Sequence, residues 1–429
     1  MHHRWAVAVD KTRVVIRVAA ATFLIGCALW FLVFPGVLVH RDMVIVDTPA
    51  LSAWNFGTAP GHAARNAPQD GVLAVVGLVV PASWVARLIL VGSAVGACVA
   101  SCRFAQGAVN EVAAMAVLIW NPFVVERLLQ GHWTVVAAFW LLPLVASLKN
   151  RPGFQAITMW ATSLTPTGAI AGAAVGIATG RKKIMVPVAV AMSVPWLVPS
   201  LLHRPVAAAT DVFRPSSLWE LVGLGGIWNA EARPSLYVPL LGIVLLAFLL
   251  TAAPHADRAL LALAGVGFAL ATASLLPLGD LYATIPGAGL LRDGQKWLLL
   301  ASPALCQLAG NVRWPALAIA LTIFQVPSLP QDVAALHPVP EDASWYEATA
   351  PVPTMTLVDR HPALNPALKA SPIPPSGELV VDGTVVERAS DAPPPSQAEW
   401  DLGLGLTLWW MVLPAVIMAF YRRPSIPGH

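Results

Sequence analysis

A series of long apolar segments constrains this chain more than any other feature. A helix needs about 20 apolar residues to cross the hydrocarbon of a bilayer, and fewer where it is bent or shielded by neighbouring helices. Apolar residues make up 57% of the sequence and charged residues only 11%, which excludes a water-soluble protein. We therefore predict an all-α polytopic membrane protein with about twelve transmembrane helices. The predicted spans are 14–36, 84–102, 110–125, 134–148, 154–164, 168–179, 184–202, 238–252, 259–276, 297–310, 314–327 and 404–421.

The distribution of Lys and Arg predicts the orientation of these spans. Short loops rich in Lys and Arg stay on the cytoplasmic side. Alternate connecting segments carry most of these residues, including Arg181-Lys182-Lys183 and Arg422-Arg423 near the end of the chain. We therefore expect a plasma-membrane protein whose N- and C-termini are both cytoplasmic. The longer polar segments then lie outside, at 40–70, 121–133, 203–237 and 277–296.

The C-terminal part of the chain differs from the predicted transmembrane core, residues 1–327. Residues 328–401 are rich in Pro, Asp and Glu, and 378–387 has two apolar runs around Asp-Gly, which is typical of a β-hairpin. The apolar content is too low for a core of its own, so we expect a small extracytoplasmic appendage on the membrane domain. Residues 402–429 form the last span and a basic cytoplasmic tail. The apolar segment 71–80 is too short to cross and is predicted to be re-entrant or interfacial.

Two acidic residues follow the first span closely. The span ends at Pro35-Gly36, and Arg41, Asp42 and Asp47 come directly after it. A carboxylate in this position can serve as a catalytic base that faces a lipid-borne substrate, or it can simply begin a solvated loop. Both interpretations stay open from this stretch alone.

Two further outer segments combine ionisable and aromatic residues. The segment 121–133 contains Glu126, Arg127, His132 and Trp133, and a Gly-rich turn at 224–231 contains Trp228 and Asn229. Such side chains can bind a sugar by stacking and hydrogen bonding. The alternative for the first segment is an interfacial helix whose charges pair locally, and for the second a purely structural turn.

A third outer segment is suited to binding an anion. Arg292 and Lys296 follow three glycines and precede the span at 297–310. A helix N-terminus with Arg and Lys beside it attracts a phosphate through free N–H groups and charge-assisted hydrogen bonds. At an outer membrane face we expect a lipid phosphate there. Alternatively, Arg292 pairs with Asp293 and Lys296 extends to the headgroups.

The order of these motifs resembles an actinobacterial family of membrane proteins in the GT-C superfamily of polyprenyl-phosphate-dependent glycosyltransferases. The resemblance covers roughly residues 10–330 and is most specific in the blocks Asn121-Pro122-Phe123 and Arg292-Asp293-Gly294-Gln295-Lys296-Trp297. The other matching pieces are Arg41-Asp42, Pro68-Gln69-Asp70, 126–133, Leu164-Thr165-Pro166-Thr167-Gly168 and 225–231. The first outer loop also faintly resembles that of mycobacterial arabinofuranosyltransferases.

The resemblance implies a GT-C-like fold and an inverting glycosyltransferase that works on the outer face. Its donor would be a polyprenyl-phosphate sugar, with a decaprenyl carrier and arabinofuranose or mannose as the sugar, and its acceptor a cell-envelope glycan or glycolipid. The general base in that superfamily lies in the first outer loop, which Asp42 or Asp47 matches. The phosphate would be bound by Arg292, Lys296 and Arg41, and the sugar or acceptor by the remaining candidates: Glu126, Arg127, His132, Trp133, Trp228 and Asn229.

Two other functions fit a polytopic chain. A lipid or glycan transporter needs ionisable residues near the middle of its spans, whereas most charges here lie at span ends. A non-catalytic scaffold of envelope biosynthesis would keep the fold without the chemistry. The glycosyltransferase requires no cofactor or metal, a divalent cation is compatible with it, and no nucleic-acid partner is expected. The cysteines Cys27, Cys98, Cys102 and Cys306 lie in apolar runs, where a disulfide framework or zinc site is not expected.

Overall fold

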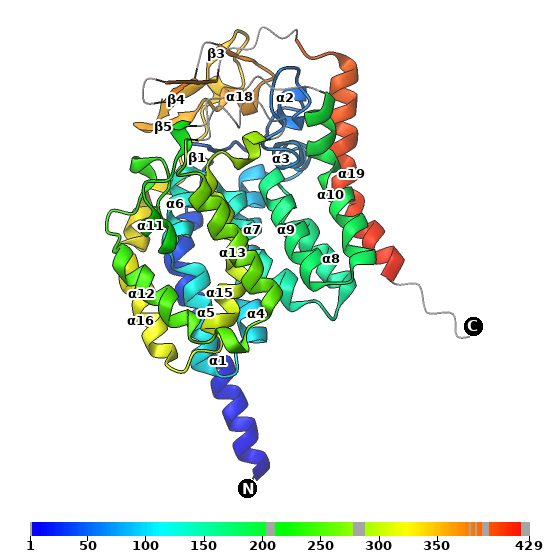
Figure 1. Cartoon of the computed structure of the whole chain (residues 1–429). Coiled ribbons are helices and arrows are strands. Elements are labelled where there is room, and N and C mark those ends of the chain that lie inside the picture. The colour runs from blue at the N-terminus through cyan, green and yellow to red at the C-terminus, as the bar shows by residue number, and fades with distance from the viewer. Residues whose placement is uncertain are drawn as a thin grey trace, which may run out of the picture.

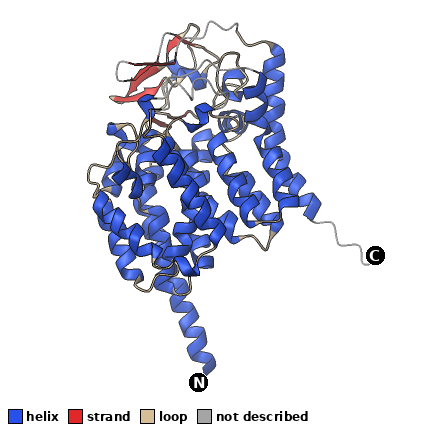
Figure 2. Ribbon diagram, in the orientation of Figure 1, coloured by secondary structure: helices blue, strands red, loops and turns tan. Residues whose placement is uncertain are grey.

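The computed structural model is mostly helical and describes residues 2–202, 211–277, 288–376, 379–381, 384–387 and 394–421. Figure 1 shows a helical bundle, and Figure 2 shows that the strands gather at one end of it. The helices of the bundle are α1 (His2–Leu29), α4 (Ala82–Phe104), α5 (Ala108–Ile119), α6 (Pro122–Gln130), α7 (Trp133–Ser147), α8 (Pro152–Ala161), α9 (Pro166–Thr179), α10 (Lys182–Leu202), α12 (Pro239–Leu250), α13 (Arg258–Ala273), α15 (Ser302–Ala309), α16 (Pro315–Gln325) and α19 (Gln397–Tyr421).

Six helical stretches in the described ranges are long and apolar enough to cross a membrane. They are Lys11–Val33, Ala82–Phe104, Ala108–Gln130, Lys182–Leu202, Pro315–Leu336 and Gln397–Tyr421. The chain is therefore a membrane protein. Twelve full-length spans are not found, because α7, α9, α12 and α13 are apolar but only 10–17 residues long. Helices this short reach across hydrocarbon only where neighbours shield their ends.

The segment 121–133 is mostly a buried helix, α6, where the prediction was a polar loop. The side chain of Asn121 accepts a hydrogen bond from Val124 N (3.0 Å), and Pro122 takes the first helical position, so α5 stops and α6 begins at once. Every residue of α6 is buried. The physical reason is that its charged side chains find partners inside the protein, so they need no water.

The first loop after α1 forms a hairpin, β1 (Leu38–His40) and β2 (Met43–Ile45), which pair antiparallel. Arg41 and Asp42 make its tip, and Arg41 has a left-handed backbone with φ 49°. The tip lies against Gly131, where a Cβ would overlap the backbone of Asp42 and Met43. Glycine at position 131 therefore allows the hairpin to approach the junction between α6 and α7.

Residues 328–401 cover this hairpin with short elements rather than a large domain (Figure 1). The antiparallel pair β7–β8 confirms the hairpin predicted at 378–387, although its Asp-Gly turn lies outside the described residues. Val39 and Val44 of the first hairpin share a small apolar cluster with Val339 and Ala363. The elements are α17 (Leu329–Asp332), η7 (Val333–Leu336), η8 (Ala343–Trp345), β3 (Val352–Pro353), β4 (Met355–Val358), β5 (His361–Leu364), α18 (Ala367–Ala370), β6 (Pro375–Ser376), β7 (Leu379–Val381) and β8 (Thr384–Glu387).

Short helices complete the fold around this end of the bundle. The segment 71–80, predicted to be re-entrant or interfacial, falls largely in α3 (Gln69–Gly77), a short and mostly buried helix. At its start the Lys369 ammonium of α18 pairs with the Asp70 carboxylate, which ties the appendage to the bundle. The remaining short elements are η1 (Trp30–Val33), α2 (Ala53–Phe56), η2 (Asp211–Phe213), α11 (Leu218–Val222), η3 (Ala230–Ala232), η4 (Ala253–His255), η5 (Ala288–Leu291) and η6 (Gly294–Ala301).

Candidate functional site

The carboxylate of Asp42 is oriented by two side chains. Its Oδ2 accepts hydrogen bonds from Gln130 Nε2 (2.9 Å) and His132 Nε2 (3.0 Å). Its backbone N–H donates to the carbonyl oxygen of Gln130 (3.2 Å). The side chain is 39% exposed. Asp42 is therefore an oriented and partly exposed carboxylate at the hairpin tip.

The tautomer of His132 follows from its second neighbour. Its Nδ1 lies 2.9 Å from Nη1 of Arg127. A guanidinium can only donate, so Nδ1 must accept and the ring proton must be on Nε2. The ring therefore donates to Asp42 and fixes the direction of that carboxylate.

Arg127 connects this pair to the segment before η6. Its guanidinium contacts both carboxylate oxygens of Asp293, with Nη2 to Oδ1 at 2.8 Å, and also donates to Oε1 of Gln295. Arg127 has no exposed surface and Asp293 is 7% exposed. Asp293 adopts a left-handed backbone with φ 56°, which is uncommon outside glycine. A continuous chain of contacts thus runs Asp42–His132–Arg127–Asp293.

Glu126 ties the Gly-rich turn to the same network. Its two carboxylate oxygens accept hydrogen bonds from the backbone N–H groups of Gly226 (2.9 Å) and Ile227 (3.0 Å). The amide of Gln295 donates to it as well. Glu126 has no exposed surface, so it holds the turn in place and does not face a ligand.

Asn229 acts on Asp42 through Gln130. Its Nδ2 donates to Oε1 of Gln130 (2.8 Å), which leaves the Gln130 amide nitrogen to donate to Asp42. Asn229 also accepts from the backbone of Glu231 (3.1 Å) at the start of η3. The turn at 224–231 therefore supports the orientation of the carboxylate indirectly, through Gln130.

The electrostatics keep Asp42 ionised and make Lys296 a weak acid near neutral pH. Burial would raise the pKa of Asp42, but the hydrogen bonds from His132 and Gln130 and the charge of Arg65 outweigh it and hold the pKa below its usual range. Burial lowers the pKa of Lys296 to about 8, and although the Asp293 charge acts in the opposite direction, nearby cations lower it further. The charge of Arg65 lowers the pKa of both groups.

Arg292 lies over an aromatic pair beside this network. Its guanidinium carbon is 4.6 Å from the centre of the Phe213 ring, and that ring meets Trp228 edge-on at 4.9 Å. Stacking of this kind fixes the plane of a guanidinium. The predicted residues Arg292 and Trp228 are therefore linked through Phe213, which the sequence analysis did not select.

Other predicted residues have positions that do not suit their expected roles. Trp133 is 1% exposed and belongs to the core, where its ring fills space between helices. Arg41 donates to the carboxylate of Glu231 (3.2 Å), whose side chain is 73% exposed. Asp47 donates its backbone N–H to Glu341 (2.8 Å) and lies near Arg87, and among the described residues no hydrogen bond or ion pair joins it to the Asp42 network.

Three polar residues of this network were not selected from the sequence. Gln130, Asp293 and Gln295 were parts of conspicuous motifs, yet their roles as partners of Asp42, Arg127 and Glu126 depend on contacts across the fold. Their clustering with Glu126, Arg127 and Lys296 in two short blocks was the only available signal. Adjacency in sequence does not reveal which side chains pair.

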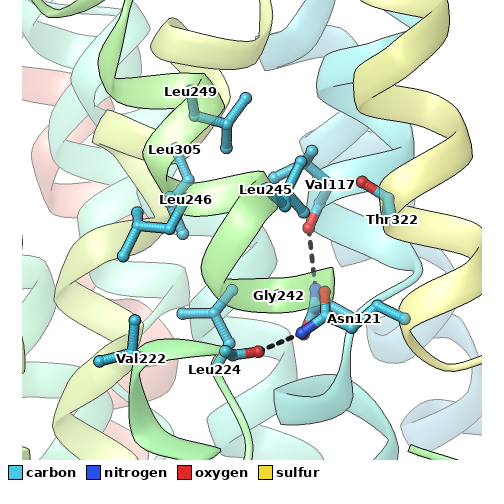
Figure 3. Close-up of a pocket in the computed structure, with 12 residues that line it drawn as sticks. Val117, Asn121, Val222, Leu224, Gly242, Leu245, Leu246, Leu249, Leu305 and Thr322 are labelled. Carbon is cyan, nitrogen blue, oxygen red and sulfur yellow. Dashed lines mark hydrogen bonds between the residues drawn. The ribbon is translucent and has the colours of Figure 1, made fainter. Parts of the chain in front are cut away.

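The small pocket behind the Gly-rich turn is not a ligand site. Figure 3 shows leucine side chains of α12 around it and the Asn121 amide bonded to the carbonyl of Val117 (2.9 Å). Its volume is about 10 Å³, so it holds one water at most. Within the described ranges, no three side chains of His, Cys, Asp or Glu are grouped so as to hold a metal ion.

Comparison with protein-family models, curated proteins and solved structures finds no match to this chain.

Proposed function

We propose that this membrane protein is a glycosyltransferase that moves a sugar from a polyprenyl-phosphate donor to a hydroxyl group of a cell-envelope glycan or glycolipid. The observation that carries this proposal is the geometry of Asp42. Two donors fix its Oδ2, and the carboxyl stays ionised because its pKa is lowered. An ionised and oriented carboxylate can accept the proton of a hydroxyl, and because the lowered pKa makes it a weak base, its placement has to carry the catalysis.

In the proposed reaction, the acceptor hydroxyl attacks the anomeric carbon of the sugar. The bond from that carbon to the phosphate oxygen breaks, and polyprenyl phosphate leaves with the bonding electrons. The proton of the attacking hydroxyl passes to Oδ1 of Asp42, so charge and atoms balance. Attack opposite the leaving group inverts the anomeric configuration. His132 and Gln130 are positioning residues, since they reach the reaction only through Asp42.

The donor phosphate would be bound by Arg292 and Lys296. Negative charge grows on the leaving phosphate in the transition state, and fixed cations nearby stabilise it. Two observations support this. The charge of Arg65 acts on both Lys296 and Asp42. Asp293, whose charge acts on Lys296, has its Oδ2 4.0 Å from Nδ1 of His132. Arg41 has no part in this proposal, because it pairs with Glu231. The sugar would be arabinofuranose or mannose on a decaprenyl carrier.

The proposed orientation puts this site on the outer face, with both termini cytoplasmic. Its support is the distribution of charge along the bundle. Arg13 and Arg17 pair with Glu111, and Lys149 pairs with Asp257 (3.2 Å), at the end of the bundle away from the strands. The Asp42 network lies at the strand end.

Transfer of radiolabelled sugar by the purified protein tests the proposal. Asp42→Asn should lower the rate about 10²- to 10⁴-fold while polyprenyl-phosphate binding is kept, because an amide cannot take the proton. Asp47→Asn is the matched control, since Asp47 lies in the same loop with separate partners. Full transfer by Asp42→Asn together with loss in Asp47→Asn would move the base to Asp47. Full transfer by both variants would refute the mechanism.

A further inference from the structure

An apolar cavity of about 430 Å³ lies on the side of the bundle, separate from the Asp42 network. Five helices contribute to it, namely α3, α4, α7, α8 and α19, through residues such as Val72, Leu88, Gly92, Leu141, Trp160 and Trp410. Among them, α4 and α19 are long enough to cross a membrane. We call this space the side cavity.

The walls of the side cavity are mainly apolar, and their side-chain donors are already used within the protein. Trp160 and Trp410 stack with ring centres 4.2 Å apart. Their indole N–H groups donate within the protein, Trp160 to the carbonyl of Trp410 (2.9 Å) and Trp410 to Oγ of Ser163 (2.8 Å). The hydroxyl of Ser93 donates to the carbonyl of Ile89 (2.7 Å). A space with so few polar partners suits hydrocarbon better than water.

The side cavity is continuous with the surface that faces the bilayer. Leu88 lines it and is 70% exposed, and Val91 and Val95 extend the same exposed apolar strip along α4. In a membrane this strip contacts lipid tails. A tail can therefore enter sideways, and an empty space of this size would forfeit the dispersion contacts of its lining.

We infer that the side cavity binds one acyl chain of a membrane glycerophospholipid and that this chain helps to pack α19 against α3, α4 and α8. We do not assign this space to the polyprenyl donor, because the cations proposed for the donor phosphate, Arg292 and Lys296, belong to the Asp42 network. The cation at the start of α3, Lys369, already pairs with Asp70. The inference does not depend on the proposed function.

Gly92 provides the test, because a Cβ added there meets no atom within 4 Å. The side chain of Gly92→Leu would project into the side cavity without displacing the backbone. Gly265→Leu on α13 is the matched control, since Gly265 is equally unobstructed in mid-helix and does not line the cavity. Gly92→Ala is the second variant, because a methyl group leaves most of the space.

Native mass spectrometry and lipid extraction of the full chain, purified in mild detergent, measure occupancy. We expect one retained phospholipid in the wild type and in Gly265→Leu, and about tenfold lower occupancy in Gly92→Leu, the factor that follows from displacing two buried methylene groups. Gly92→Ala should be intermediate. After delipidation, palmitoyl-oleoyl phosphatidylglycerol should raise the melting temperature of the wild type and of Gly265→Leu, and that of Gly92→Leu less.

Three results would overturn the inference. They are a wild type that retains no phospholipid, equal occupancy in Gly92→Leu and Gly265→Leu, and retention of polyprenyl phosphate in place of a phospholipid. If Gly92→Leu fails to fold, equal occupancy in Gly92→Ala and the wild type would have the same consequence.

Discussion

The buried pair of Arg127 and Asp293 should stabilise the fold as a unit. Arg127→Met leaves the Asp293 carboxylate without its counter-charge, and Asp293→Asn does the same to the guanidinium. Removing one partner of a buried ion pair costs about 3–5 kcal/mol, because the other charge stays buried and uncompensated. The structure supports this range, since Arg127 is 0% exposed and binds Asp293 through two nitrogens.

The double variant Arg127→Met/Asp293→Asn separates this explanation from a simple loss of packing. With both charges removed, neither charge of the pair is left uncompensated, whereas the loss of the Arg127 donors to Gln295 and His132 is common to Arg127→Met and the double variant. The double variant should therefore lose less stability than the sum of the two single losses, by roughly 1–3 kcal/mol. The control is Lys149→Met, which breaks the more exposed pair with Asp257 and should cost at most about 1 kcal/mol.

Thermal unfolding in detergent, followed by tryptophan fluorescence, provides the assay. At about 2 °C per kcal/mol for a chain of this length, each single variant should melt roughly 6–10 °C below the wild type. Burial would raise the pKa of Asp293, but Arg127 outweighs it and holds that pKa below its usual range. The stabilisation is therefore complete at neutral pH and is lost only as acid titrates Asp293 below its ordinary pKa of about 3.9. Strictly additive effects of the two substitutions would refute the reasoning.

Three further predictions concern the hairpin tip and the cation near it. His132→Phe should lower kcat of the proposed transfer about 10- to 150-fold with little change in KM, as expected for a lost hydrogen bond to a carboxylate, and His132→Gln should recover part of it. Binding of farnesyl phosphate should weaken as pH rises through about 8, where Lys296 loses its proton, and Lys296→Arg should abolish that pH dependence. Gly131→Ala should lower the melting temperature by several degrees, because the backbone is strained at φ +90° and the added Cβ overlaps Met43. Gly265→Ala should not lower it, and equal melting temperatures of the two variants would contradict this prediction.

Much of the helical fold could be predicted from the sequence, because apolar runs and Pro or Gly boundaries are local signals. The ends of α4, α10 and α19 lie within a few residues of the predicted spans, apart from the start of α19, which extends outward from 404 to Gln397. The hairpin β7–β8 was predicted because Asp-Gly is a local turn signal. The hairpin β1–β2 carries no such signal. Its Arg41-Asp42 tip is held by distant groups, such as the backbone of Pro362 (3.0 Å).

The burial of α6 could not be predicted, because it depends on contacts between distant parts of the chain. A helix with Glu126 and Arg127 favours a membrane surface when considered alone. Inside the fold, Glu126 bonds to the backbone at 226–227 and Arg127 bonds to Asp293, more than 160 residues away. These partners replace water for both charges. Asp42, Arg292 and Lys296 could be selected from the sequence, and so could His132 and Asn229, but only as sugar-binding candidates. The contacts of His132 with Asp42 and of Asn229 with Gln130 could not be predicted.

The side chains that orient Asp42 come from separate segments of the chain. A carboxylate on a free hairpin tip would rotate, and its two oxygens would be equivalent. Here Gln130 and His132 both bind Oδ2, and each has its donor fixed by a further residue, Asn229 for the amide and Arg127 for the ring. In the proposed transfer, this arrangement would fix the orientation of the base before the substrate binds.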